Sequence, residues 1–147
     1  MPPPWFGSLW QIERTIREAA LNHNMYATFM AKPIANEPGS AMHIHQSIVN
    51  AKTGANVFSE KDGKPTEEFF SFLAGQQKFL PHVMCIMAPY VNSYRRLMRK
   101  SVAPINVHWG YDNRTVGLRV PNSSPEARRI ENRIPSSDAN PYLAIAA

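Results

Sequence analysis

Thirteen of the 147 residues are proline, and this limits the folds open to the chain more than any other feature of its sequence. Proline fixes the backbone φ angle and carries no N–H, so it is rare inside helices and inside central strands. Pro33, Pro65 and Pro89 each stand at the edge of an apolar pattern. We therefore expect several short elements joined by rigid turns.

The spacing of apolar residues predicts both helices and strands. The expected helices are 12–23, 66–80 with Thr66 as N-cap, 81–88 and a segment that opens at 140, while 92–100 is expected to be a helix or a flap-like loop. The expected strands are 26–32, 41–49, 57–58, 105–111, 115–120 and 128–134. This order predicts an α+β fold in which helices pack on an antiparallel sheet. Residues 1–11 show no clear period and are expected to form an irregular leader before a domain at 12–147.

The composition is that of one globular domain, because 44% of the residues are apolar. No apolar run approaches the ~20 residues that span a bilayer, and the first residues lack the basic-then-apolar order of a signal peptide. The single cysteine, Cys85, excludes an intramolecular disulfide and fits a reducing compartment. These features predict a cytoplasmic protein without membrane contact.

The charge balance favours an anionic partner, since 16 Lys and Arg stand against 11 Asp and Glu. The arginines fall in three clusters: Arg95, Arg96 and Arg99; Arg114 and Arg119; Arg128, Arg129 and Arg133. Arginine forks match carboxylate and phosphate groups, so a phosphorylated ligand, nucleic acid and a solvated basic face are all open on charge alone. Nucleic acid is disfavoured because the aromatic residues fall mainly on helical core stripes. The common glycine-rich phosphate loops are absent from the sequence.

The segment 39–47, GSAMHIHQS, concentrates potential ligands. At the two-residue period of a strand, His43, His45 and Ser47 share one face, with mostly apolar side chains on the other. Neutral imidazole binds divalent metals and donates to phosphate oxygens. Gly39 would let the backbone approach a ligand closely. The alternative is a strand whose histidines are ordinary polar residues with satisfied hydrogen bonds.

A second pattern lies at Arg129, Glu131 and Arg133, which share a face at the same period. A carboxylate flanked by two guanidinium groups suits a metal ligand beside an anion site, and Arg119 could add a third arginine. These features favour ATP or acyl-phosphate chemistry. The alternative is an exposed strand with salt bridges of little consequence.

Seven motifs of unrelated character also occur in one order along the chain. They are ATFMAKP (27–33), GSAMHIHQS (39–47), NSYRR (92–96), APIN (103–106), DNRTVGLRVP (112–121), RRIENRIP (128–135) and NPYLAIAA (140–147). Together they resemble the catalytic domain of the glutamine synthetase family over residues 12–147. The resemblance implies a ligase that activates the γ-carboxylate of glutamate with ATP and transfers it from γ-glutamyl phosphate to ammonia or an amine.

The resemblance also implies a role for ten residues. His43 and Glu131 match metal ligands for Mg²⁺ or Mn²⁺; His45, Ser47 and Arg129 match nucleotide-binding positions; Gly39, Arg96 and Arg133 match glutamate-binding positions; Arg114 and Arg119 match catalytic groups that bind phosphate and stabilise the acyl-phosphate step. Bidentate arginines and a cation suit a reaction that depends on positioning and charge stabilisation.

Two departures from the family pattern concern the acceptor. Ammonia-using members carry a glutamate just before the Ala-Pro pair, where this chain has Val102, and they often carry an asparagine where it has Pro38. Loss of the ammonium-binding carboxylate favours an organic amine as the acceptor. The sequences of the motifs are also similar to those of the branch of the family that joins glutamate to polyamines. An ammonia-using glutamine synthetase remains the alternative.

A third departure is length, because family members are much longer. The paired glutamates that bind their second metal lie upstream of the matched segment, so the chain is expected to be a fragment with half a metal site. The resemblance implies glutamate, ATP and a small amine as partners, and a homo-oligomer for the full-length protein. An inactive remnant and a basic nucleic-acid-binding module are the alternatives of another class.

Overall fold

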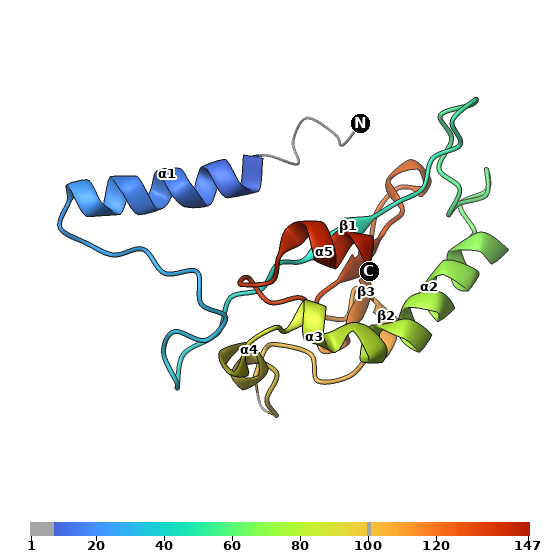
Figure 1. Cartoon of the computed structure of the whole chain (residues 1–147). Coiled ribbons are helices and arrows are strands. Elements are labelled where there is room, and N and C mark those ends of the chain that lie inside the picture. Colours follow the sequence, from blue (N-terminus) through green and yellow to red (C-terminus); the bar gives the residue numbers. More distant parts are fainter. Residues whose placement is uncertain (1–7, 100) are drawn as a thin grey trace.

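The computed structural model describes residues 8–99 and 101–147. The helices are α1 (Ser8–Asn22), α2 (Glu67–Phe79), α3 (Met84–Met87), α4 (Val91–Arg96) and α5 (Pro141–Ala146), with 3₁₀ helices at η2 (Leu80–Val83) and η3 (Pro125–Ala127). The strands are β1 (Ile44–Gln46), β2 (Trp109–Tyr111), β3 (Leu118–Val120) and β4 (Ile130–Asn132). Most elements are short, as the proline content predicts (Figure 1). No helix in the described residues is both long and apolar enough to cross a membrane.

The four strands form one sheet in the order β1–β4–β3–β2. Strand β4 is antiparallel to both β1 and β3, as predicted, whereas β2 and β3 are parallel, so the sheet is mixed. The two-residue period is the same for either strand direction and cannot distinguish them. Strands of three residues rise only about 10 Å, so the six residues of the 112–117 connection can return the chain to the start of β2.

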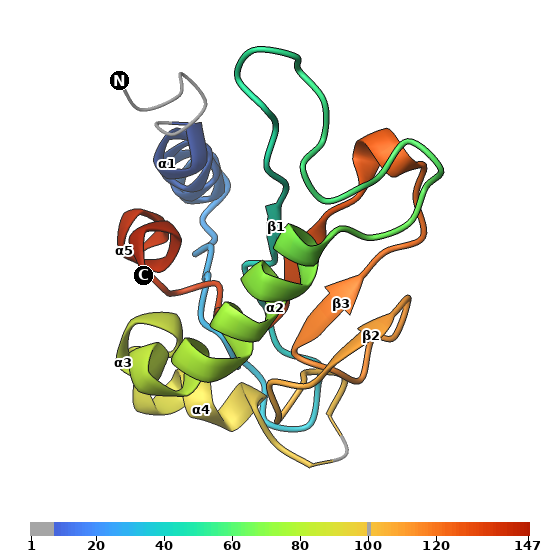
Figure 2. The same cartoon turned by 90° about the vertical axis from the view of Figure 1, so that its right-hand side faces the viewer.

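One face of the sheet is covered by α2, which crosses in front of it in Figure 2. Leu118 and Ile130 of the sheet pack with Phe58, Phe69 and other apolar side chains in a single buried cluster. Thr66 begins α2 as predicted, because its hydroxyl oxygen accepts a hydrogen bond from the Phe69 N–H at 3.2 Å. Side chains alternate along a strand, so the residues between these apolar positions point to the opposite face. That face carries the polar residues considered below.

Helix α1 stands apart from the sheet and α2, at the end of an extended segment (Figure 1). Arg17 ties it to that segment by a hydrogen bond to the Ala27 carbonyl at 3.4 Å and by a guanidinium 4.9 Å from the Phe29 ring centre. Residues 8–11 belong to this helix, so the predicted irregular leader is wrong there, while residues 1–7 lie outside the described residues. The apolar spacing that predicts a helix at 12–23 begins about one turn after the first residue of α1, so it misses the start of the helix.

The predicted strand at 26–32 is wrong, because this segment pairs with no strand in the described residues. Its backbone is instead bonded by a side chain: the Asn92 amide accepts from the Lys32 N–H at 2.8 Å and donates to the Lys32 carbonyl at 2.9 Å. A side-chain amide can satisfy the donor and the acceptor that a neighbouring strand would otherwise satisfy. The apolar residues of the segment therefore give a strand pattern without a sheet partner.

Other boundaries differ from the predictions in smaller ways. Strand β1 is shorter than the predicted 41–49, although isolated bridges to Ser136 and Asn56 extend the pairing at both ends. The predicted strand at 57–58 is wrong, since those residues lie between two isolated bridges rather than in a ladder. The segment 92–100 begins within helix α4. The helix predicted at 81–88 is divided into η2, which contains Pro81, and α3, which begins at Met84.

Candidate active site

The open face of the sheet brings together the two polar patterns that the sequence predicts. Antiparallel pairing of β1 with β4 sets His45 opposite Glu131, and pairing of β4 with β3 sets Arg119 opposite Glu131. His43, one step before β1, lies with its Nδ1 atom 2.9 Å from Glu131 Oε1. The pairing of the strands therefore brings His43, His45 and Arg119, from two distant parts of the chain, around one carboxylate.

Glu131 is the centre of this cluster and is only 3% exposed. Arg119 donates to its Oε2 at 2.6 Å, and Arg133 donates to its Oε1 at 2.9 Å. Burial opposes ionisation of the carboxyl, but the hydrogen bonds from both arginines outweigh it and hold the pKa of Glu131 below its usual range. Together with Arg129 nearby, Arg119 and Arg133 outnumber the two carboxylates of the cluster, Glu131 and Asp112, and this excess of positive charge favours an anionic ligand.

His43 provides a nitrogen donor beside this carboxylate. Burial lowers the pKa of His43, and the charge of Arg133 lowers it further, while Glu131 acts in the opposite direction. The neutral imidazole is the form that binds metals. Within 8–99 and 101–147, however, no group of three or more His, Cys, Asp or Glu side chains could hold a metal ion. His43 and Glu131 fit as two ligands of a divalent cation, whose other ligands would be water, substrate oxygens or further polypeptide.

Of the three predicted nucleotide-binding residues, two meet. Arg129 donates from Nε to His45 Nδ1 at 3.2 Å; His45 lies opposite Glu131 in the paired strand, and Arg129 lies two residues before Glu131. Ser47 lies just beyond the end of β1 and is exposed. The structure therefore groups His45 and Arg129 with the carboxylate cluster and leaves Ser47 at its margin.

Arg119 also holds Asp112, which sequence reasoning missed. Its guanidinium donates to Asp112 Oδ1 from Nε at 3.1 Å and from a second nitrogen. Asp112 has a φ of 45°, a left-handed conformation that aspartate tolerates better than most residues. Nothing in the sequence indicates that the turn at Asp112 would orient Arg119 toward Glu131.

Arg96 and Gly39, both predicted to bind glutamate, are in contact with each other. A Cβ atom at Gly39 would lie 2.4 Å from the Ala31 carbonyl oxygen and 2.8 Å from Arg96 Cγ, so only glycine fits. Arg96 is 2% exposed and donates to the Ile134 carbonyl. Burial lowers its pKa to about 10, against the opposing charge of Asp138. Gly39 thus packs directly on a buried arginine.

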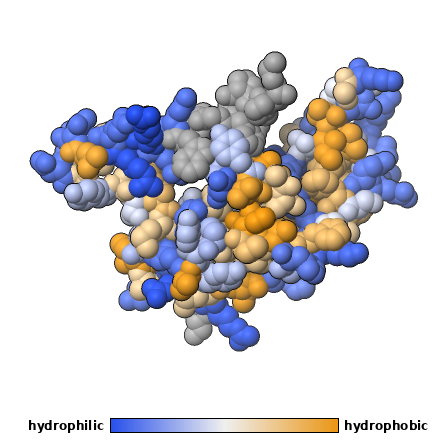
Figure 3. Space-filling view, viewed as in Figure 1, coloured by the Kyte–Doolittle hydropathy of each residue, from blue (hydrophilic) through white to orange (hydrophobic). Residues whose placement is uncertain are grey.

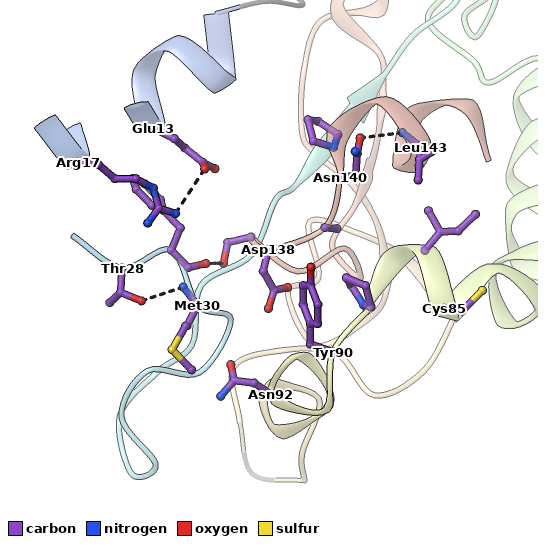
Figure 4. Close-up of a pocket in the computed structure, with 16 residues that line it drawn as sticks. Glu13, Arg17, Thr28, Met30, Cys85, Tyr90, Asn92, Asp138, Asn140 and Leu143 are labelled. Atoms are coloured by element: carbon purple, nitrogen blue, oxygen red, sulfur yellow. Dashed lines mark hydrogen bonds and ion pairs between the residues drawn. The ribbon is translucent and has the colours of Figure 1, made fainter. Parts of the chain in front are cut away.

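A second group missed from the sequence lies near Arg96, because the charge of Asp138 acts on the Arg96 guanidinium. Ser93, fully buried one turn earlier in α4, donates to the Asp138 carboxylate with contacts of 3.0 and 3.1 Å. Figure 4 shows Asp138 and Asn92 projecting from two different segments toward the same region. Ser93 and Asp138 are 45 positions apart, a separation at which no sequence period indicates contact.

Arg114 lies in a different part of the surface, where it lines a pocket of about 490 Å³ with Arg133 and Val102. A larger pocket of about 780 Å³ separates α1 from α5 (Figure 4) and contains none of the ten predicted residues. Figure 3 shows apolar surface over α5, where Leu143 and Ile145 are exposed. The predicted residues that cluster around Glu131 therefore lie outside this larger pocket.

A mixed sheet that carries a buried glutamate between two arginines, beside a histidine, is found in a known class of protein. The family model described as "Glutamine synthetase, catalytic domain" matches residues 8–147, and the chain belongs to that family, as its motifs predict. γ-Glutamylputrescine synthetase from Escherichia coli K12 is 43% identical over 92% of this chain and 29% of its own length. Glutamate–isopropylamine ligase from a Pseudomonas species is 44% identical over 92% of the chain and 30% of its own length.

Relatives named glutamine synthetase are nearly as similar. Glutamine synthetase from Pyrococcus abyssi is 42% identical over 90% of this chain and 29% of its own length. Among solved structures, the Plasmodium falciparum glutamine synthetase superposes with a TM-score of 0.87 at 26% identity, over 96% of this chain and 28% of that one. The chain thus spans about three tenths of the length of the relatives it matches.

Proposed function

We propose that the protein containing this chain is an ATP-dependent ligase that joins the γ-carboxylate of glutamate to an amine through γ-glutamyl phosphate. The observation that carries the proposal is Glu131, a buried carboxylate held by Arg119 and Arg133 beside the His43 imidazole. One carboxylate and one imidazole next to two guanidinium groups suit a site where a cation and several anionic groups must meet.

Within this proposal, each predicted residue has one role. His43 and Glu131 would hold Mg²⁺ or Mn²⁺, which supplies charge neutralisation at the transferring phosphoryl group. His45, Ser47 and Arg129 contact the nucleotide; Arg114 and Arg119 bind phosphate oxygens; Arg96, Arg133 and the Gly39 backbone bind glutamate. Because Asp112 holds the Arg119 guanidinium and the Ile134 carbonyl holds that of Arg96, these two groups are oriented before substrate arrives.

The choice between an amine and ammonia depends on Val102. This side chain is 70% exposed and lines the same pocket as Arg133, where the family resemblance would put an ammonium-binding glutamate. Without that carboxylate, an ammonium ion lacks a counter-charge and a proton acceptor from this segment. Two of the relatives are named for amine substrates, γ-glutamylputrescine synthetase and glutamate–isopropylamine ligase, while others are glutamine synthetases. An ammonia-using enzyme is the rival proposal.

We also propose that the protein acts as a homo-oligomer in the cytoplasm. The described residues provide only two side chains for the cation, so polypeptide from elsewhere would complete the site. The rivals of another class are an inactive remnant and a basic nucleic-acid-binding module. The second predicts binding that weakens steeply with salt and needs no metal.

The test uses the protein translated from the complete reading frame that encodes this chain. Phosphate release is measured with ATP, glutamate and Mg²⁺, adding an amine or ammonium in parallel. We expect release that requires glutamate and an amine and that the Glu131→Gln substitution abolishes. Glu18→Gln, which neutralises an exposed carboxylate on α1, is the matched control and should keep full activity. Release with ammonium alone would favour the rival, and no release with either would favour a remnant.

A further inference from the structure

The pocket beside Arg133 has walls of two kinds. Its volume is about 490 Å³, and its apolar side is formed by large side chains that are half exposed or more. These are Met98, Val102 and Ile105, while the charged groups that line the pocket are Arg99, Arg114 and Arg133. An apolar surface next to guanidinium groups can accommodate a ligand with one anionic end and one hydrocarbon end.

Arg133 connects this pocket with the candidate active site. One of its nitrogens donates to Glu131 Oε1 at 2.9 Å, whereas its buried Nε has no hydrogen-bond partner. An unpartnered charged donor in a buried position is costly and favours an incoming acceptor. The inner end of the pocket therefore suits a carboxylate or phosphate group. The side formed by Val102 and its apolar neighbours suits the hydrocarbon part of a ligand.

No carboxylate is present among the described residues that line this pocket. A smaller adjoining pocket, of about 260 Å³, shares the 98–102 segment and does contain Glu37, but with Lys32, Arg95 and Arg99 around it. Cations therefore outnumber carboxylates on both sides of the segment. A ligand with an additional positive charge would face more cationic groups than carboxylates here and would be repelled.

We propose that the acceptor amine binds in this pocket and carries a neutral hydrocarbon tail, so that it is a monoalkylamine and not a diamine or polyamine. This inference rests on the proposed function and specifies its substrate class. Glutamate and phosphate use the guanidinium groups of Arg114 and Arg133, and the tail covers Met98, Val102 and Ile105. Burying that apolar surface favours binding, and a second ammonium group in the tail would oppose it.

The transfer step balances with this substrate. The neutral amine nitrogen forms a bond to the γ-carbon of γ-glutamyl phosphate, and the bond from that carbon to the phosphate oxygen breaks. Phosphate leaves with the electron pair, and the nitrogen loses one proton to solvent. No further oxidant, reductant or co-reactant is needed.

The experiment compares three acceptors with four-carbon chains, using the full-length protein with ATP, glutamate and Mg²⁺. They are n-butylamine with a neutral tail, putrescine with a cationic tail and 4-aminobutyrate with an anionic tail. We expect kcat/KM for n-butylamine to exceed that for putrescine by at least about tenfold, because a like charge would face the guanidinium groups. The same assay is run with ammonium.

Two substitutions test whether this pocket is responsible. Val102→Glu adds a carboxylate to the wall and should shift the preference toward putrescine, whereas Val91→Glu adds one to an equally exposed valine outside it and should not. Arg99→Gln removes a positive charge from the wall and should lower the ratio of kcat/KM for n-butylamine to kcat/KM for putrescine. Arg95→Gln removes one from the adjoining pocket only and should leave the ratio unchanged.

Each result has a distinct meaning. Putrescine or 4-aminobutyrate equal to or better than n-butylamine would overturn the neutral-tail inference and leave the proposed amine ligase standing. Release with ammonium alone would overturn the inference and the choice of an amine together. No release with any acceptor would overturn the proposed function itself, and this inference with it. A preference for n-butylamine that Val102→Glu fails to shift would contradict the assignment to this pocket.

Discussion

Replacing Glu131 with glutamine tests whether the carboxylate cluster is a buried, charged unit or a surface ion pair. The substitution keeps the shape of the side chain and removes its charge. Glu131 is 3% exposed, and the Arg119 and Arg133 side chains that hold it are 15% and 10% exposed. Arg133 would then lose its carboxylate partner, while Arg119 would keep only Asp112.

The expected loss is set by that uncompensated charge. Removing one member of a buried ion pair typically costs 3–5 kcal/mol, and because Arg119 retains Asp112 as a second partner we expect the lower end, about 3 kcal/mol. For a chain of this size a loss of about 3 kcal/mol corresponds to a decrease in Tm of about 6–12 °C.

The measurement is urea denaturation and thermal unfolding of the full chain without added metal. Glu18→Gln is the control, since it breaks the exposed Arg14–Glu18 pair on α1 and should leave the midpoint unchanged. A change for Glu131→Gln no larger than that of the control would refute the reasoning. It would mean that the cluster is open to solvent and carries little of the site's rigidity.

Further predictions concern Gly39 and the Ser93–Asp138 pair, which lie near Arg96. Gly39→Ala should be strongly destabilising because its Cβ would lie 2.4 Å from a carbonyl oxygen. Gly75→Ala is the control: its Cβ would have nothing within 4 Å, so the substitution should stabilise α2 by about 0.5–1 kcal/mol. Unfolding midpoints that change in the same direction for both variants would contradict this prediction. Asp138→Asn removes the negative charge that acts on the buried Arg96, and Ser93→Ala removes the hydroxyl that holds Asp138. Both should raise KM for glutamate more than KM for ATP, because Arg96 is expected to bind glutamate. Equal effects on both KM values would indicate a merely structural role.

Local chemistry made several elements predictable from the sequence. Thr66 and Asn140 begin helices because their side-chain oxygens accept from backbone N–H groups of the first turn, and both were recognisable by residue type and position. The two-residue period also predicted that His43 and His45 share a face, and that Arg129, Glu131 and Arg133 share another. Once β1 and β4 pair in this register, those faces coincide, and the carboxylate cluster follows.

What could not be predicted depends on contacts between distant parts of the chain. Nothing local distinguishes a parallel from an antiparallel partner for β3, so the mixed sheet was missed. The Asn92 amide satisfies the Lys32 backbone across 60 positions, and for that reason an apolar segment with a strand pattern is not a strand. Asp138 likewise reaches Ser93 only because the turn after β4 folds back on α4.

The central claim is that the γ-carboxylate of glutamate attacks the γ-phosphorus of ATP in a site built around Glu131. The most direct test supplies the full-length protein with glutamate labelled with ¹⁸O in its γ-carboxylate, together with ATP, Mg²⁺ and n-butylamine. Mass spectrometry of the released phosphate then reports the origin of its oxygens. The account predicts one ¹⁸O atom in each phosphate, because the bond that breaks lies between the γ-carbon and the former carboxylate oxygen. Phosphate released without ¹⁸O would show simple ATP hydrolysis and would contradict the account.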